Sequence, residues 1–156
     1  MSDTMTVAQA FDAAVAMEES ARQVHLRLAE KFDAVAGARA GEFFRSLADD
    51  ETEHVRLWGE IRKSLPASRL AEEASGLLAA SLIGARGLLE ADPAGKVESL
   101  AQAVELVRNV ENAELLAVFR VLAIELVPDA RRREFLDAQI QGHLNRIERF
   151  AHGLGS

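Results

Sequence analysis

The sequence predicts an all-α protein in which four long helices form a bundle, with a long crossover connection between the second and the third. β-Branched residues do not alternate with polar ones for long anywhere, whereas Ala, Leu, Glu and Arg recur at helical spacing. Glycine and proline interrupt the chain at intervals that leave room for four long helices. At 156 residues the chain makes one domain, which we assign to residues 1–156.

The first helix is predicted between an N-terminal cap and a glycine. Thr4 or Thr6 can cap its start, because a threonine hydroxyl accepts a hydrogen bond from an amide of the first turn. The helix is predicted to end near Val35, since Gly37 follows.

The second helix is predicted from about Arg39 to Ser64, and it ends before Pro66. The stretch 67–91 is then the crossover. It is predicted to hold at most a short fifth helix, because three glycines break it: Gly76, Gly84 and Gly87.

The third helix has a strong start signal. Asp92 is followed by Pro93, which is the pattern of an N-cap residue and a proline at the first helical position. This helix is predicted to end at Val127, before Pro128.

The fourth helix completes the bundle. Asp129 can cap its start, and it is predicted to continue to about His152, with Gly153 beyond its end. Two pairs of long helices joined by a long connection make one of the four-helix bundle topologies.

The composition limits the chemistry. Eighteen Lys and Arg against twenty-five Asp and Glu give a net charge of −7, which argues against nucleic acid or an anionic membrane as a partner. The chain has no cysteine, so disulfides, thiol nucleophiles, cysteine-bound zinc and iron–sulfur clusters are excluded. Any metal must therefore be held by carboxylates and imidazoles.

The sequence predicts a cytoplasmic protein without a transmembrane helix. Its N-terminal part carries Asp12, Glu18 and Glu19, unlike the basic start and unbroken apolar run of a signal peptide. The longest weakly charged stretch, 74–85, is far shorter than the roughly 20 residues that a membrane span needs.

Each predicted helix carries an ionisable residue in a stripe that should otherwise be apolar. Residues spaced alternately by three and four positions lie on one face of a helix. In chain order the four stripes are Phe11, Ala14, Glu18, Ala21, His25 and Leu28; Phe44, Leu47, Glu51, His54, Trp58 and Ile61; Val107, Val110, Glu114, Ala117, Val121 and Ile124; and Arg133, Leu136, Ile140, His143, Ile147 and Phe150. The first half of the chain therefore resembles a degenerate copy of the second.

Several carboxylates that face one core need a counter-charge, because an unpaired buried carboxylate costs several kcal/mol or becomes protonated. Glu51 and His54, three residues apart on one helical face, can chelate one divalent ion while Glu51 reaches a second. The remaining predicted ligands are Glu18 (or Glu19, if that helix is rotated), Glu111, Glu114 (which the stripe favours) and His143. Four carboxylates balance two Fe²⁺ or Mn²⁺ ions, and imidazoles suit iron, manganese or zinc.

These motifs resemble those of the ferritin-like di-iron carboxylate proteins, and most closely the rubrerythrin branch, over essentially the whole chain. The resemblance is carried by a Glu-x-x-Ala-x-x-x-Tyr element in the first helix, a Glu-x-x-His in the second and a Glu-x-x-Glu in the third. The matching residues are Glu18, Ala21 and His25; Glu51 and His54; and Glu111 and Glu114, with Phe119 where the family has an aromatic residue.

The chain departs from the family in three respects. Ile140 stands where the family has the Glu of a second Glu-x-x-His, three residues before His143, which predicts a weaker or emptier second metal position. The chain contains no Tyr, and His25 takes the place of one near the metals; we expect it to be a hydrogen-bonded core residue beside the ligands rather than a ligand. Without cysteine there is no rubredoxin domain, so an external electron donor is required.

The resemblance implies a site for two iron ions, with manganese or zinc as alternatives, that reacts with hydrogen peroxide or dioxygen. Two other functions stay open: a ferritin-like protein that oxidises or stores iron without turning over peroxide, and a helical scaffold whose metal site has decayed. The resemblance also implies a homodimer, for which the apolar third helix and the crossover offer a face.

Overall fold

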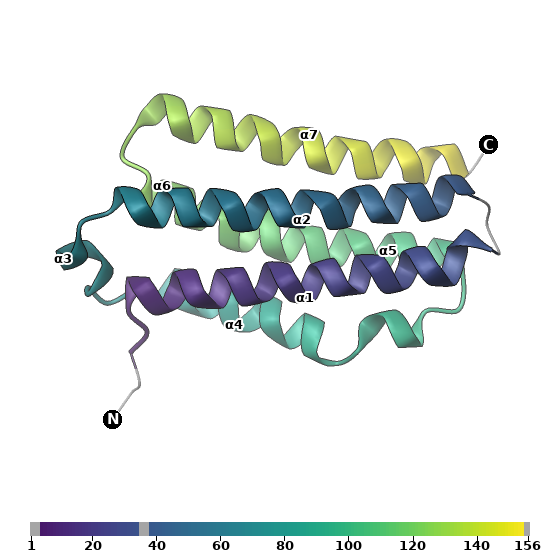
Figure 1. The fold of residues 1–156 in the computed structure, drawn as a ribbon, viewed down its shortest axis with the longest axis horizontal. Helices are drawn as coiled ribbons and strands as arrows, with labels where there is room; N and C mark the ends of the chain where they lie inside the picture. Colours follow the sequence, from purple (N-terminus) through teal and green to yellow (C-terminus); the bar gives the residue numbers. More distant parts are fainter. Residues whose placement is uncertain (1–3, 35–37, 155–156) are drawn as a thin grey trace.

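The computed structural model describes residues 4–34 and 38–154. Within these ranges the chain is helical apart from turns and one isolated antiparallel bridge between Thr6 and Glu73, which confirms the predicted all-α class. Figure 1 shows the long helices lengthwise beside one another, from α7 (Ala130–Leu154) at the top of the view to α4 (Gly76–Glu90) at the bottom. No helix in the described ranges is both long and apolar enough to cross a membrane.

Helices α1 (Val7–Asp33) and α2 (Ala38–Ser64) pack against each other. Thr6 caps α1 reciprocally with Gln9: Thr6 Oγ1 accepts from the Gln9 amide at 3.2 Å, and Gln9 Oε1 accepts from the Thr6 amide at 2.8 Å. The predicted end of this helix, at Val35 with Gly37 beyond, lies outside the described residues. The second predicted helix is confirmed to within one residue at its start and ends where predicted.

The crossover holds more helix than predicted. α3 (Ala67–Leu70) is short, but α4 has 15 residues. The prediction that glycines break this stretch is wrong, because Gly76 begins α4 while Gly84 and Gly87 lie inside it. A glycine costs about 1 kcal/mol in a helix relative to alanine. α4 offsets this cost by packing an apolar face against α1 and residues 112–119, and the buried side chains are Leu78, Leu82, Ala85 and Leu89.

The predicted start of the third long helix at Asp92 is also wrong. The residues after it form only a 3₁₀ turn, η1 (Pro93–Lys96), and the helix α5 (Leu100–Glu111) begins after Ser99. Asp92 has a left-handed φ of 48°, whereas a residue that caps a helix start has extended backbone. Its carboxylate pairs with Arg27 instead. Ser99 has the extended backbone, and its hydroxyl accepts from a first-turn amide at 3.2 Å.

The third long helix changes its winding halfway along. α5 continues directly into a π-helical segment, η2 (Asn112–Phe119), and then into α6 (Arg120–Leu126). It ends one residue before the predicted Val127. In a π-helix each amide bonds five residues back instead of four, so the turns are wider and hold more residues.

This wider winding shifts the buried face of the helix, so the predicted stripe is wrong beyond Glu114. Ala117 and Val121 are half-buried and Ile124 is 66% exposed. The core positions are instead Val118, Leu122 and Leu126. The first two are displaced by one residue from the prediction, as an extra residue in the helix rotates every later side chain by about 100°.

Helix α7 starts as predicted and buries the four central residues of the predicted stripe, while Arg133 and Phe150 at its ends are half-buried. Asp129 Oδ1 accepts from the Arg131 amide at 2.9 Å. The helix runs through Gly153 to Leu154, two residues beyond the predicted end near His152; glycine can adopt helical backbone at modest cost. The buried residues are Leu136, Ile140, His143 and Ile147.

Aromatic side chains pack on either side of the buried polar residues. Phe43 of α2 and Phe150 of α7 stack with ring centroids 3.8 Å apart and planes at 7°. Trp58 of α2 packs edge-on to Phe11 of α1 and lies 4.3 Å from Phe119 of η2. These contacts hold four chain segments around one apolar interior.

Candidate metal centre

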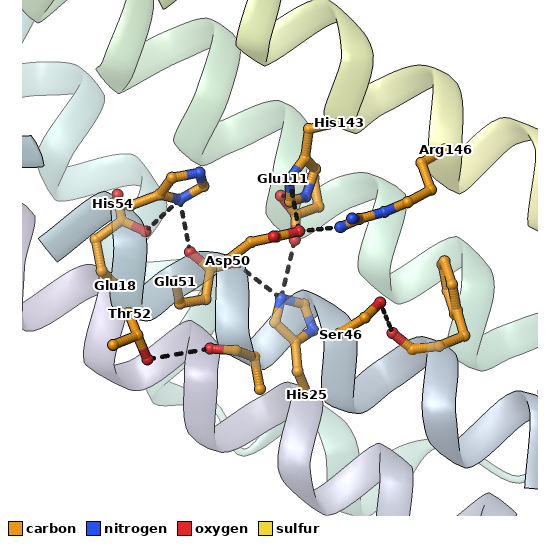
Figure 2. A network of polar contacts seen from close by, with 12 residues as sticks. Glu18, His25, Ser46, Asp50, Glu51, Thr52, His54, Glu111, His143 and Arg146 are labelled. Carbon is orange, nitrogen blue, oxygen red and sulfur yellow. Dashed lines mark hydrogen bonds and ion pairs between the residues drawn. The ribbon is translucent and has the colours of Figure 1, made fainter. Parts of the chain in front are cut away.

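The ionisable residues singled out from the sequence converge in the helical interior, and Figure 2 labels all of them except Glu114. They come from every long helix: Glu18 and His25 from α1, Glu51 and His54 from α2, Glu111 and Glu114 from the third long helix, and His143 from α7. The four carboxylates and His25 are at most 1% exposed. Glu19, the alternative to Glu18, has a side chain that is 54% exposed, so α1 is not rotated toward it.

One group of ligand atoms joins Glu18, Glu51 and His54. His54 Nδ1 lies 2.9 Å from Glu51 Oε2 and 3.3 Å from Glu18 Oε2. The Trp58 indole N–H donates to the other oxygen, Glu18 Oε1, at 2.8 Å. One atom from each of the three residues lies within 4.8 Å of the others, which is close enough to hold one metal ion.

A second group joins His25, Glu51 and Glu111, again with its ligand atoms within 4.8 Å of one another. His25 Nε2 lies 3.2 Å from Glu51 Oε1 and 2.9 Å from Glu111 Oε1. His143 Nε2 lies 2.8 Å from the remaining oxygen, Glu111 Oε2. Glu51 therefore presents one oxygen to each group.

Several of these buried atoms have no hydrogen-bond partner. The unpartnered atoms are both carboxylate oxygens of Glu114, both carboxylate oxygens of Glu111, His143 Nε2 and His25 Nδ1. The contacts at Glu111 are short but do not have hydrogen-bond geometry. Because buried polar atoms are normally satisfied, these unpartnered oxygens and nitrogens indicate that a further group belongs among them.

Two of the four buried carboxylates, Glu18 and Glu114, have raised pKa values, so burial favours their protonated form. Burial and the contact with Glu51 raise the pKa of Glu18 to about 8, against the opposing effect of His54. Burial and the charges of Glu51, Glu18 and Glu111 raise the pKa of Glu114 well above its ordinary value. A divalent cation would displace these protons, since it supplies the positive charge that the carboxylates lack.

His25 and His54 are shifted toward the charged form. Burial alone lowers the pKa of His25, but its contacts with Glu111 and Glu51 outweigh burial and raise this pKa to about 9. The pKa of His54 is raised well above its ordinary value in the same way, by Glu18 and Glu51 against burial. Burial acts to raise the pKa of Glu51, but its contacts with Glu18, His25 and His54 hold it well below the ordinary range.

His143 on α7 has the surroundings that metal-bound imidazoles have. His143 Nδ1 lies 3.2 Å from Asp50 Oδ2, which leaves Nε2 directed at Glu111. Such a carboxylate beside the outer ring nitrogen fixes the tautomer of a metal-binding histidine. His25 Nδ1 has no such partner, and His25 Nε2 makes a hydrogen bond with Glu51, so the geometry favours a hydrogen-bonding role for His25 beside the ligands. That role stays a prediction.

Three residues of the site were not assigned a role there from the sequence. Asp50 contacts His143 and pairs with Arg146, and Trp58 donates to Glu18. The sequence gives a weak indication that two of them lie near the site. Asp50 precedes Glu51, and Arg146 lies one helical turn after His143. Ile140, one turn before His143, is 3% exposed and brings only apolar surface to the core.

Comparison of the chain with protein-family models, with curated proteins and with solved structures gave no match. The buried glutamate and histidine groups described above could hold a metal ion, and their chemistry is the basis for assigning a function.

Proposed function

We propose that the chain is a ferritin-like four-helix bundle of the rubrerythrin type that binds two divalent metal ions, iron first among them. In this proposal it reduces hydrogen peroxide or dioxygen with electrons from an external donor. The observation that carries the proposal is Glu51, whose two oxygens belong to two different groups of ligand atoms. A carboxylate shared in this way can bridge two ions.

The charge of the buried cluster supports two ions rather than one. Four carboxylates are buried and would carry a charge of −4 when ionised. Two divalent ions balance that charge in full, whereas a single ion would leave two carboxylates to protons. Carboxylate oxygens with imidazole nitrogens are ligands that iron, manganese and zinc accept.

The residues divide into two positions. Glu18 and His54 would hold one ion, with Glu51 available to both positions. Glu111 would hold the other, with His143, whose Nε2 lies 2.8 Å from Glu111 Oε2, as its imidazole in place of His25. Glu114 offers a carboxylate with no other partner to either position. When bound, two iron ions supply electrons and Lewis acidity for the reduction of peroxide or dioxygen.

The surrounding side chains position these ligands and keep water out. The Trp58 indole N–H fixes one oxygen of Glu18, so that the other turns toward His54. Asp50 holds His143 by its outer nitrogen. The ring of Phe119 packs 5.6 Å from the His54 ring and closes the interior on that side.

The same site could serve iron oxidation or storage, and only a rate of peroxide consumption separates the two activities. A decayed scaffold is less well supported, because the polar side chains still meet at hydrogen-bond distances and keep unpartnered ligand atoms. The homodimer stays a prediction; the predicted face has exposed apolar side chains in the crossover and the third long helix, at Leu77, Ile83, Leu116 and Ile124.

The test is the metal content per chain of protein expressed with iron and manganese available. We expect about two ions in the wild type. Glu51→Gln keeps the shape of the side chain but removes the bridging charge, and it should lose both ions. Glu53→Gln is the matched control, since Glu53 lies on the same helix with a 62% exposed side chain.

The outcomes of this test separate the three functions. Two ions and peroxide consumption in the presence of a reductant support the oxidoreductase. Two ions and iron oxidation without peroxide turnover support the ferritin-like alternative. Absence of metal in the wild type, or full retention of both ions in Glu51→Gln, would contradict the proposed di-metal site.

A further inference from the structure

A cavity of about 300 Å³ opens between α2 and α7, beside the candidate metal centre. His54 and His143 both line it, and they are the most exposed members of the buried cluster, with side chains that are 12% and 7% exposed. The carboxylates of the cluster lie deeper. A small molecule that enters by this cavity therefore meets the two imidazoles first.

Arg146 reaches the cavity from α7 (Figure 2). Its guanidinium pairs with Asp50 of α2, and Asp50 Oδ2 also lies 3.2 Å from His143 Nδ1. Arg146 Nε is buried and has no hydrogen-bond acceptor among the described residues. A buried N–H without an acceptor is costly, and an oxygen or an anion in the cavity would remove that cost.

The other charges of the cavity do not neutralise Arg146 completely. Asp50 is shared between Arg146 and His143, so one carboxylate serves two groups. Glu53 pairs with Arg56, which also pairs with Glu60. Burial, and after it the neighbouring charge of Arg149, lower the pKa of Arg146.

We propose that this cavity is the mouth of the centre and a binding site for a small inorganic anion, held by the Arg146 Nε–H beside His143. Its part in the reaction rests on the proposed function, because an anion at this point stands next to the ligands of the second position. The anion site itself uses only protein groups and does not need a bound metal.

The test uses azide, a small anion, as the probe. Metal-free, ¹⁵N-labelled protein is titrated with sodium azide at constant ionic strength, and the Arg146 Nε–H and the backbone amides of Gly142 and His143 are followed by NMR. We expect shifts of these signals that saturate. A hydrogen bond to a charged group is worth enough to change an affinity by about tenfold or more, so Arg146→Gln should weaken azide binding at least about tenfold.

Two further variants separate the hydrogen bond from charge. Arg146→Lys keeps the positive charge without the Nε donor, and it should bind azide with intermediate affinity. If circular dichroism shows that Arg146→Gln does not fold, the Arg146→Lys variant is compared with the wild type instead. Arg56→Gln removes a charge from the same cavity but one already paired with Glu53 and Glu60, so its azide affinity should stay close to that of the wild type.

Shifts that rise linearly with azide and never saturate would overturn the anion site, and so would equal affinities in the wild type and Arg146→Gln. Metal content is measured on the same preparations. Metal binding without an azide site would overturn this inference alone. An azide site without metal binding would overturn the proposed function alone.

Discussion

The metal-free protein should lose stability as the pH rises from 5 to 9. His25 has an ordinary pKa of 6.5 and a folded-state pKa of about 9. Below pH 6.5 it is protonated in both states, and its ion pairs with Glu51 and Glu111 contribute in full. Between pH 6.5 and about 9 only the folded protein holds the proton, so stability falls as the pH rises through this range.

Glu18 acts in the same direction over a lower range. Its pKa rises from 4.5 to about 8 in the folded protein, so the unfolded chain releases its proton first and gains stability relative to the folded state between these values. Glu51 and Glu111 have lowered pKa values, and their contribution to stability is complete above their ordinary value of 4.5. None of these four groups therefore opposes the predicted loss of stability above pH 5.

The magnitude follows from the pKa difference. One unit of pKa corresponds to about 1.4 kcal/mol, so His25 alone accounts for about 3 kcal/mol between pH 6.5 and 9. Glu18 and His25 both contact Glu51, so their effects are coupled and do not add. For a chain of 156 residues a loss of about 3 kcal/mol lowers the Tm by about 6–12 °C.

The assay is thermal unfolding by circular dichroism at pH 5, 6, 7, 8 and 9, with EDTA and separately with excess Mn²⁺. The Tm should fall with pH in EDTA. With Mn²⁺ it should rise over the same range, because the ion competes with protons that are easier to remove at high pH. His25→Gln should reduce the fall above pH 6.5, while the part due to Glu18 remains up to about pH 8. A Tm that is constant or rises between pH 6 and 9 in EDTA would refute the assignment of these protons.

Three further predictions test separate parts of the structure. Trp58, the single tryptophan, donates to Glu18 at 2.8 Å, so Mn²⁺ or Fe²⁺ should quench its fluorescence and Glu18→Gln should abolish the response; quenching that survives this substitution would place the ion elsewhere. Ile140→Glu should raise the metal content per chain if the second position lacks a ligand, and an unchanged content by elemental analysis would contradict that view. Ile83→Glu places a charge on the exposed crossover face of the predicted dimer and should halve the mass seen by light scattering to that of the 17.0 kDa chain; a wild type that is already monomeric contradicts the dimer.

The predicted stripes of α1 and α2, and the central part of that of α7, face the interior because they depend only on spacing. In α1, α2 and α7 the winding stays α-helical from end to end, so residues three and four apart share a face. The burial of Glu18, Glu51 and His143 in these stripes then places them opposite one another. No knowledge of loops or of long-range contacts was needed for this part of the site.

The start of the third long helix was not predictable from its local pattern. Two residues can cap this helix: Asp92, which precedes Pro93, and Ser99, which precedes Leu100. The sequence favours Asp92, because proline is common at the first helical position. The choice is made by tertiary contacts: the Asp92 carboxylate pairs with Arg27 of α1, and its backbone turns left-handed. Because Asp92 and Arg27 lie far apart along the chain, the sequence around Asp92 does not reveal their contact.

The π-helical segment was missed for a different reason. A π turn exchanges one set of backbone hydrogen bonds for another and needs no special residue, so Asn112–Phe119 looks like ordinary helix in the sequence. Its effect is nevertheless large, since the residues after Glu114 face directions that α-helical spacing does not give. Both Glu111 and Glu114 are buried where this segment begins, which the sequence could offer only as a choice between them.

The features that cost stability are concentrated around the buried ionisable residues. The π turns, the unpartnered oxygens of Glu111 and Glu114, and the shared carboxylate of Glu51 all lie around the same interior site. Replacing buried charges by apolar residues is generally neutral or stabilising, and Ile140 shows that this core accepts such a residue one turn from His143. A site that had lost its ligand would be free to become apolar in this way at each position. Because Glu111 and Glu114 stay buried with oxygens that lack a hydrogen-bond partner, a group that could hold a metal ion is a physical reason for this core to stay polar.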